Sequence, residues 1–168
     1  MKHEILTERM ILAPFIYQDN ELFHKLNIDP YIRKFMWDDE SITIDTAKEI
    51  MKKNEDHFEV DNFGIWKVNL KETDEIIGYT GLWYFFNEQQ PQLIYALLKR
   101  FTKQGYALEF SRAIIQYAFK TLDFKYLVAA TDEPNIHSQK VAERLGMKYH
   151  EKRVENNKPT LFFKIENG

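Results

Sequence analysis

The segment that follows Gly105 limits the possible folds of this chain more than any other feature. Polar residues recur along it at helical spacing, namely Glu109, Arg112, Gln116 and Lys120. Apolar residues fill the complementary face, which is the pattern of a helix that buries one side. A strand-like run over residues 91–98 precedes the glycine. The sequence therefore predicts a strand, a tight glycine turn and a long helix that packs against a sheet.

Strand-like and helix-like runs alternate along the rest of the chain. The predicted strands are residues 9–15, 64–70, 76–86, 125–130, 147–154 and 160–165, and the other predicted helices begin at Asp19, near Pro30, at about Thr43 and at Ile136. No repeat or flexible linker divides the 168 residues, of which 44% are hydrophobic. This length and composition suit one core, so we expect a single α/β (α+β) domain over residues 1–168.

The glycine turn also indicates a ligand. Backbone N–H groups at the start of a helix lie at the positive end of its dipole and bind phosphate well. The chain contains neither G-x-x-x-x-G-K-[ST] nor G-x-G-x-x-G, which are the loops of nucleotide triphosphatases and dinucleotide-binding proteins. We therefore expect a polyphosphate cofactor of another kind.

Five motifs resemble, in order and spacing, those of the GNAT superfamily of acyl-CoA-dependent N-acyltransferases, and most closely its RimJ/RimL-like branch. They are the runs Leu6 to Leu12, Ile77 to Leu82, Thr102 to Ala107, Gly105 to Glu109, and Asn135 to Met147. The resemblance implies the GNAT fold, a twisted mixed β-sheet of about seven strands with helices on both faces and a splayed central strand pair. It also implies N-acetyl transfer from acetyl-CoA to a primary amine.

The resemblance further implies where acetyl-CoA or coenzyme A binds. The expected cofactor residues around the glycine turn are Lys99, Arg100, Lys103, Gln104, Gly105, Tyr106 and Ala107. In the family the preceding strand splays from its neighbour and pairs with the pantetheine arm, so the N–H of Leu97 or Leu98 is the expected oxyanion donor. Lys140 is expected near the phosphates, although a solvated charged face would explain it and Arg144 equally well.

Asn135 and Ser138 are the expected side chains at the reacting end of the cofactor. Asn135 is implied to bond the pantetheine amides, although an asparagine there is also a favoured helix cap. Ser138 shares an inward stripe with Val141, Ala142 and Leu145. Many GNAT branches carry a tyrosine acid at the place of Ala142, and RimJ/RimL-like members commonly have alanine there. Ser138 is then the expected acid for the departing thiolate, with a bond to its own helix as the alternative.

Two further positions depart from the family pattern. Gln92 stands where relatives often carry a glutamate base, and an amide cannot accept a proton at neutral pH. A water relay or the nearby Glu88 would have to serve as the base. Thr102 and Lys103 replace the usual aromatic-glycine pair before the loop.

The acceptor is the least defined part of the sequence. Met36 and Trp37 lie between the first helices, which line the acceptor side in this family, and Trp83 and Phe85 come from the central strand. Aromatic residues beside the acidic residues 38–40 suit a cationic amine, although acidic residues at the start of a helix would explain them equally well. A protein N-terminus, an amino acid, a polyamine and an antibiotic amine all remain open.

Composition limits the chemistry and the partners. The chain has no cysteine, which removes a covalent thiol intermediate and leaves direct attack in a ternary complex. Its histidines lack metal-ligand spacing, so we expect no metal. A net charge of −3 argues against general nucleic-acid binding, and no apolar run approaches a membrane span. We expect a cytoplasmic monomer or homodimer. The alternatives are a CoA-binding regulatory module without transferase activity and a nucleotide-binding regulator.

Overall fold

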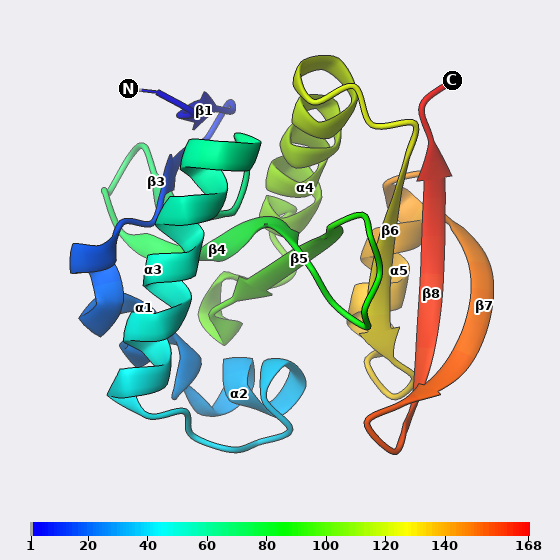
Figure 1. The fold of residues 1–168 in the computed structure, drawn as a ribbon, viewed down its shortest axis with the longest axis horizontal. Coiled ribbons are helices and arrows are strands. Elements are labelled where there is room, and N and C mark those ends of the chain that lie inside the picture. The colour runs from blue at the N-terminus through cyan, green and yellow to red at the C-terminus, as the bar shows by residue number, and fades with distance from the viewer. Residues whose placement is uncertain (1) are drawn as a thin grey trace.

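The computed structural model describes residues 2–168, which form two antiparallel sheets flanked by helices (Figure 1). The strands are β1 (Ile5–Leu6), β2 (Met10–Pro14), β3 (Ile65–Leu70), β4 (Ile76–Trp83), β5 (Gln92–Leu97), β6 (Tyr126–Asp132), β7 (Lys148–Glu155) and β8 (Lys158–Glu166). The helices are α1 (Asn20–Asn27), α2 (Pro30–Met36), α3 (Ile44–Asp61), α4 (Tyr106–Gln116) and α5 (Ile136–Arg144). Short helical turns are η1 (Tyr17–Asp19), η2 (Lys99–Phe101) and the π-helical η3 (Tyr117–Thr121).

The first sheet has the order β1-β2-β3-β4-β5 and the second the order β6-β8-β7, and all of these pairs are antiparallel. β5 and β6 contact one another, but within residues 2–168 they are not hydrogen-bonded neighbours. The expected GNAT fold and its splayed strand pair are thus confirmed. In place of a single mixed sheet of about seven strands, residues 2–168 form eight strands in two antiparallel sheets, because the β5–β6 gap interrupts the ladder.

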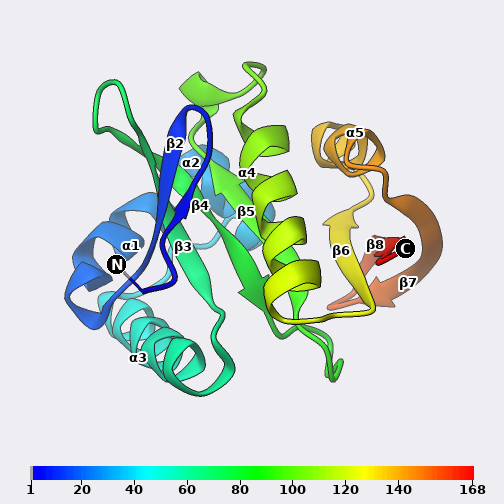
Figure 2. The same ribbon diagram turned by 90° about the horizontal axis from the view of Figure 1, so that it is seen from above.

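Helices cover both faces of the first sheet, with α1 and α3 on one side and α4 on the other (Figure 2). Strand alternation produces this arrangement, since successive side chains point to opposite faces. In β3, Ile65 packs in the cluster that contains Phe23, whereas Trp66 packs in the cluster that contains Phe110 and Ile114. The predicted packing of the helix after Gly105 on a sheet is therefore confirmed.

Two predicted boundaries differ from the structure by three residues or more. The helix that starts at Tyr106 is α-helical only to Gln116 and continues as a π-helical turn. The strand predicted over residues 76–86 ends at Trp83. Phe86 and Asn87, which follow it, have a left-handed backbone conformation with φ of 57° each. No helix among residues 2–168 is both long and apolar enough to cross a membrane.

Candidate functional site

A cavity of about 250 Å³ lies where β5 and β6 separate. Its walls come from β5, the last residues of β6, α5, α2, the segment just after β4 and the hairpin that joins β7 to β8. Small-molecule sites commonly lie in such a concave gap, where backbone groups of the strands are left unpaired. The cavity therefore brings together β5, which is the strand expected to pair with the cofactor, the Asn135–Ser138 segment and part of the predicted acceptor side.

The register of β5 on β4 decides which backbone groups reach this cavity. The Leu98 N–H donates to the Ile77 carbonyl at 2.9 Å, and the Ile94 carbonyl accepts from Thr80 Oγ1 at 2.9 Å. Because the N–H groups of a strand alternate in direction, the Leu97 N–H points to the opposite edge. The Leu98 N–H is therefore already bonded and not free to act as the expected oxyanion donor, and the Leu97 N–H is the candidate that remains.

The turn before α4 has the geometry of an anion-binding cradle. Gly105 is the N-cap residue, with φ of 82°, and within the described chain no side chain caps the first turn of α4. A Cβ added to Gly105 would meet only the Arg9 guanidinium, at 3.4 Å, so the outer face of the turn is open. Uncapped N–H groups at the positive end of a helix fit a phosphate group.

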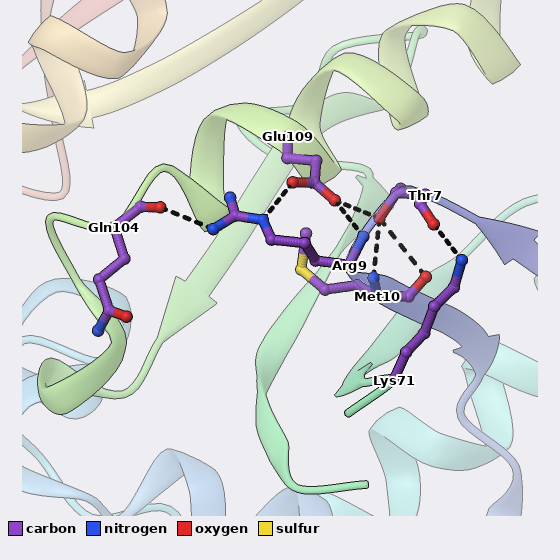
Figure 3. A network of polar contacts seen from close by, with 6 residues as sticks. All are labelled: Thr7, Arg9, Met10, Lys71, Gln104 and Glu109. Atoms are coloured by element: carbon purple, nitrogen blue, oxygen red, sulfur yellow. Dashed lines mark hydrogen bonds and ion pairs between the residues drawn. The ribbon is translucent and has the colours of Figure 1, made fainter. Parts of the chain in front are cut away.

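Arg9 holds this turn from the bend just before β2 (Figure 3). Its Nε donates to Glu109 Oε1 at 2.7 Å, its backbone N–H donates to Glu109 Oε2 at 2.9 Å, and its Nη1 donates to the Gln104 carbonyl at 3.0 Å. The guanidinium also lies 4.2 Å from the centre of the Tyr106 ring. Thr7 donates to Glu109 Oε2 at 2.6 Å. Two sequence motifs far apart along the chain thus fix one loop.

Positive charge gathers beside the start of α5. Burial lowers the pKa of His137, and the charges of Lys103, Arg144 and Lys140 lower it further. Lys103 and Lys140 are both exposed, so they can face an anion from two elements. Arg100 is directed elsewhere, because it pairs with Glu75 at 3.0 Å. The predicted phosphate role is therefore better supported for Lys103 and Lys140 than for Arg100.

Tyr95, Asn135 and Ser138 lie close together in the lining of the cavity. The Ser138 N–H donates to Asn135 Oδ1 at 3.3 Å, so Asn135 does cap α5. The Tyr95 hydroxyl lies 3.2 Å from Ser138 Oγ. Burial raises the pKa of Tyr95 to about 12, so its phenol stays protonated at neutral pH. The sequence analysis did not identify Tyr95 as a site residue, because it lies in an apolar strand. Its hydroxyl group was the one feature that could have indicated a role.

The predicted acceptor residues divide into two groups. Met36 and Phe85 line the cavity, whereas Trp37 and Trp83 are not among the described residues that line it. The Trp37 indole N–H donates to Asn27 Oδ1 at 2.8 Å, and the Trp83 ring packs edge-on against His57 at 5.0 Å. The acceptor assignment of both tryptophans is therefore not supported, because their rings are engaged with neighbouring helices.

The cavity lacks the expected alternative base. Gln92 is buried and lines it, but the Glu88 carboxylate accepts from Arg153 at 3.0 Å and is not part of its described lining. Asp38 and Asp132 do line the cavity, and both carboxylates are paired with Lys158, Asp132 at 2.8 Å. Of the two candidates for a base, Glu88 therefore lies outside the described lining of the cavity, and a water relay remains as the candidate.

Residues 9–148 match the family model described as an acetyltransferase (GNAT) domain. YnaD of Bacillus subtilis (strain 168), described as an uncharacterized N-acetyltransferase, is 26% identical over 144 residues, which are 86% of this chain and 82% of YnaD.

Two solved structures share the fold. An acetyltransferase from Agrobacterium tumefaciens str. C58 has a TM-score of 0.82 at 22% identity, with 98% of this chain and 94% of that chain covered. RimL, described as a ribosomal L7/L12 alpha-N-protein acetyltransferase in complex with coenzyme A, has a TM-score of 0.80 at 13% identity, with 96% of each chain covered. These likenesses establish the architecture around the β5–β6 gap.

Proposed function

Since this chain belongs to the acetyltransferase (GNAT) family and is an acyltransferase, we propose that it transfers an acetyl group from acetyl-CoA to a primary amine. Direct attack in a ternary complex is the proposed route, because the chain has no cysteine to carry the acetyl group. One observation carries the proposal. A single cavity is lined by the open edge of β5, by Ser138, and by Met36 and Phe85.

The two ends of acetyl-CoA would meet different parts of this site. The uncapped turn at Gly105 suits the pyrophosphate, and Lys103 and Lys140 would add charge attraction. The pantetheine arm would add to β5 as an extra strand, because the Leu97 N–H faces the gap. Asn135 uses its oxygen to cap α5, so its amide N–H groups remain as donors to a pantetheine carbonyl.

The reacting atoms would then lie between Leu97 and Ser138. The amine nitrogen attacks the thioester carbonyl carbon, and the Leu97 N–H stabilises the oxyanion that forms. Collapse breaks the carbon–sulfur bond, and Ser138 Oγ donates to the sulfur as negative charge develops. The amine arrives as its neutral form after losing a proton to water, since Asp38 and Asp132 are paired with Lys158.

The acceptor is proposed only as a primary amine, of a protein N-terminus or of a small molecule. RimL is described as acting on a ribosomal protein N-terminus, and a peptide acceptor is therefore the first to test here. The aromatic ring of Phe85 lines the cavity, and an aromatic face suits a cationic group.

Turnover with acetyl-CoA tests the proposal. The protein is incubated with acetyl-CoA and a panel of N-terminal peptides, amino acids, polyamines and antibiotic amines, and thiol release and acetylated product are measured. Product from any amine supports the proposal. Tight CoA binding without product would favour a CoA-binding regulatory module, which the amide at Gln92 also favours. A rise in melting temperature with ATP and none with CoA would favour a nucleotide-binding regulator.

A further inference from the structure

The hydroxyls of Tyr95 and Ser138 form a pair across the β5–β6 gap. Tyr95 reaches from β5 and Ser138 from α5, their oxygens are 3.2 Å apart, and both residues line the cavity. The Tyr95 ring is held by Phe110 of α4, edge-on at 5.7 Å. The Tyr95 ring therefore packs against the core, and its hydroxyl meets Ser138 at the cavity.

Counting protons shows what this pair offers to a ligand. Each hydroxyl has one proton, and one of the two is used in the bond between them. The other proton stays free to point into the cavity. A phenol is the stronger acid, so the favoured arrangement has Tyr95 donating to Ser138 Oγ and Ser138 donating to the cavity. A hydroxyl that accepts a hydrogen bond becomes a better donor itself.

We propose that Tyr95 is a positioning residue that acts through Ser138, by aiming and polarising the serine hydroxyl toward the sulfur of the departing thiol. This inference rests on the proposed acetyl transfer and names a residue that sequence motifs do not mark. Ala142, one turn after Ser138, also lines the cavity, and its small side chain brings no hydroxyl there. In this chain the phenol beside Ser138 comes from Tyr95 of β5 instead.

The acidities decide how the proton is passed. Tyr95, with a pKa of about 12, is a weaker acid than an ordinary thiol, with a pKa of about 8.5. A thiolate therefore does not keep a proton taken from Tyr95. The pair donates hydrogen bonds to the sulfur while charge develops, and the proton that the thiol finally holds is one that the amine loses as the carbon–nitrogen bond forms.

The thiol of bound CoA provides a readout that does not depend on turnover. If the pair donates to a thiolate, binding should lower the thiol pKa, because a hydrogen bond to the charged form favours it. Thiolate absorbance of bound CoA across pH should then show a lowered thiol pKa in the wild type. Tyr95→Phe and Ser138→Ala should each return at least about half of that shift. Other titratable groups that line the cavity are unchanged in these variants: Tyr31, Asp38, Asp132, His137, Glu155 and Lys158.

Kinetics give the second arm of the test. Tyr95→Phe should lower kcat about tenfold and change KM for acetyl-CoA by less than about threefold, and Ser138→Ala should lower kcat by about 10–100-fold. The double variant should be no slower than Ser138→Ala, because Tyr95 acts through the serine. Tyr126→Phe, at an exposed position outside the cavity, is the matched control and should match the wild type.

The outcomes separate this inference from the function on which it rests. An unchanged thiol pKa and an unchanged kcat in Tyr95→Phe, with acetyl transfer intact in the wild type, would overturn the inference alone. A lower melting temperature as the sole effect would make the Tyr95–Ser138 bond structural, which also overturns it. Failure of the wild type to bind CoA would overturn both.

Discussion

Arg9, in the bend just before β2, and Glu109 of α4 form an ion pair with a nitrogen–oxygen distance of 2.7 Å, although one hundred residues separate them. The same guanidinium binds the Gln104 carbonyl at 3.0 Å (Figure 3). A bidentate cation that bonds both a helix and the loop before it restricts how the loop can move. The backbone N–H groups proposed to bind phosphate are thereby held in place before the cofactor arrives.

Replacing Arg9 should weaken cofactor binding. In Arg9→Ala the loop loses its anchor, so part of the binding free energy is used to order it, and Kd for CoA should rise about tenfold, or ~1.4 kcal/mol. Calorimetry on folded protein measures this. Lys125→Ala is the control, because its ion pair with Asp123 is exposed at the other end of α4. An unchanged Kd in Arg9→Ala would contradict the anchoring role.

Glu109 should make stability depend on pH. Burial raises its pKa, but hydrogen bonds from Thr7 and Arg9 and the charge of Arg9 outweigh burial and hold the pKa below its usual 4.5. A carboxyl with a lowered folded pKa stabilises the protein above about pH 4.5 and loses this contribution as pH falls through the folded pKa. The melting temperature of Glu109→Gln should therefore lie below that of the wild type near pH 7, and the difference should shrink in acid. A constant difference would contradict this.

Gly105→Val should severely weaken CoA binding, by more than about tenfold, because a branched side chain would occupy the open face of the turn. The φ of 82° also strains a valine by roughly 1–2 kcal/mol, so some loss of stability is expected as well. Gly146→Val provides a matched strain control, since Gly146 has a φ of 91° and a Cβ there would meet Ile165 at an ordinary 3.7 Å. Equal CoA affinity in the two variants would refute the loop assignment.

Lys103 should show opposite effects on stability and binding. Its φ of 63° is a left-handed conformation that glycine adopts without steric cost, so Lys103→Gly should raise the free energy of unfolding by roughly 0.5–1 kcal/mol. Loss of the charge should weaken CoA binding in low salt, with little effect in high salt. Lys103→Ala removes the charge but keeps a side chain on the left-handed backbone. It should therefore weaken CoA binding as Lys103→Gly does, without raising the free energy of unfolding. Denaturant unfolding and calorimetry measure the two quantities.

Phe85 should affect the acceptor more than the cofactor. Phe85→Ala removes an aromatic wall from the acceptor side, so KM for the amine should rise about tenfold and KM for acetyl-CoA should stay within about twofold. Trp83→Phe is the comparison, because that ring packs on His57 instead. A larger effect of Trp83→Phe on the amine KM would restore the original sequence-based assignment of the tryptophan.

Sequence by itself determined the order of the elements and the turn at Gly105. Helical and strand periodicities are local properties, and a glycine that opens an amphipathic helix predicts both a boundary and an anion site. Five family motifs in order also determined the GNAT architecture and the placing of Asn135 and Ser138. The sequence also showed that Lys103 stands where relatives usually have a glycine, but it did not show that the backbone of Lys103 is left-handed.

Tertiary structure alone decided which groups meet in the cavity. Leu97 and Leu98 are equivalent in an apolar run, and only the register of β5 on β4 leaves one N–H bonded to Ile77 and turns the other toward the gap. Tyr95 and Ser138 are 43 residues apart and meet because α4 packs on β5 while α5 packs against α4 and β6. Such contacts depend on how elements dock, and the spacing of residues along one element carries no information about its neighbour.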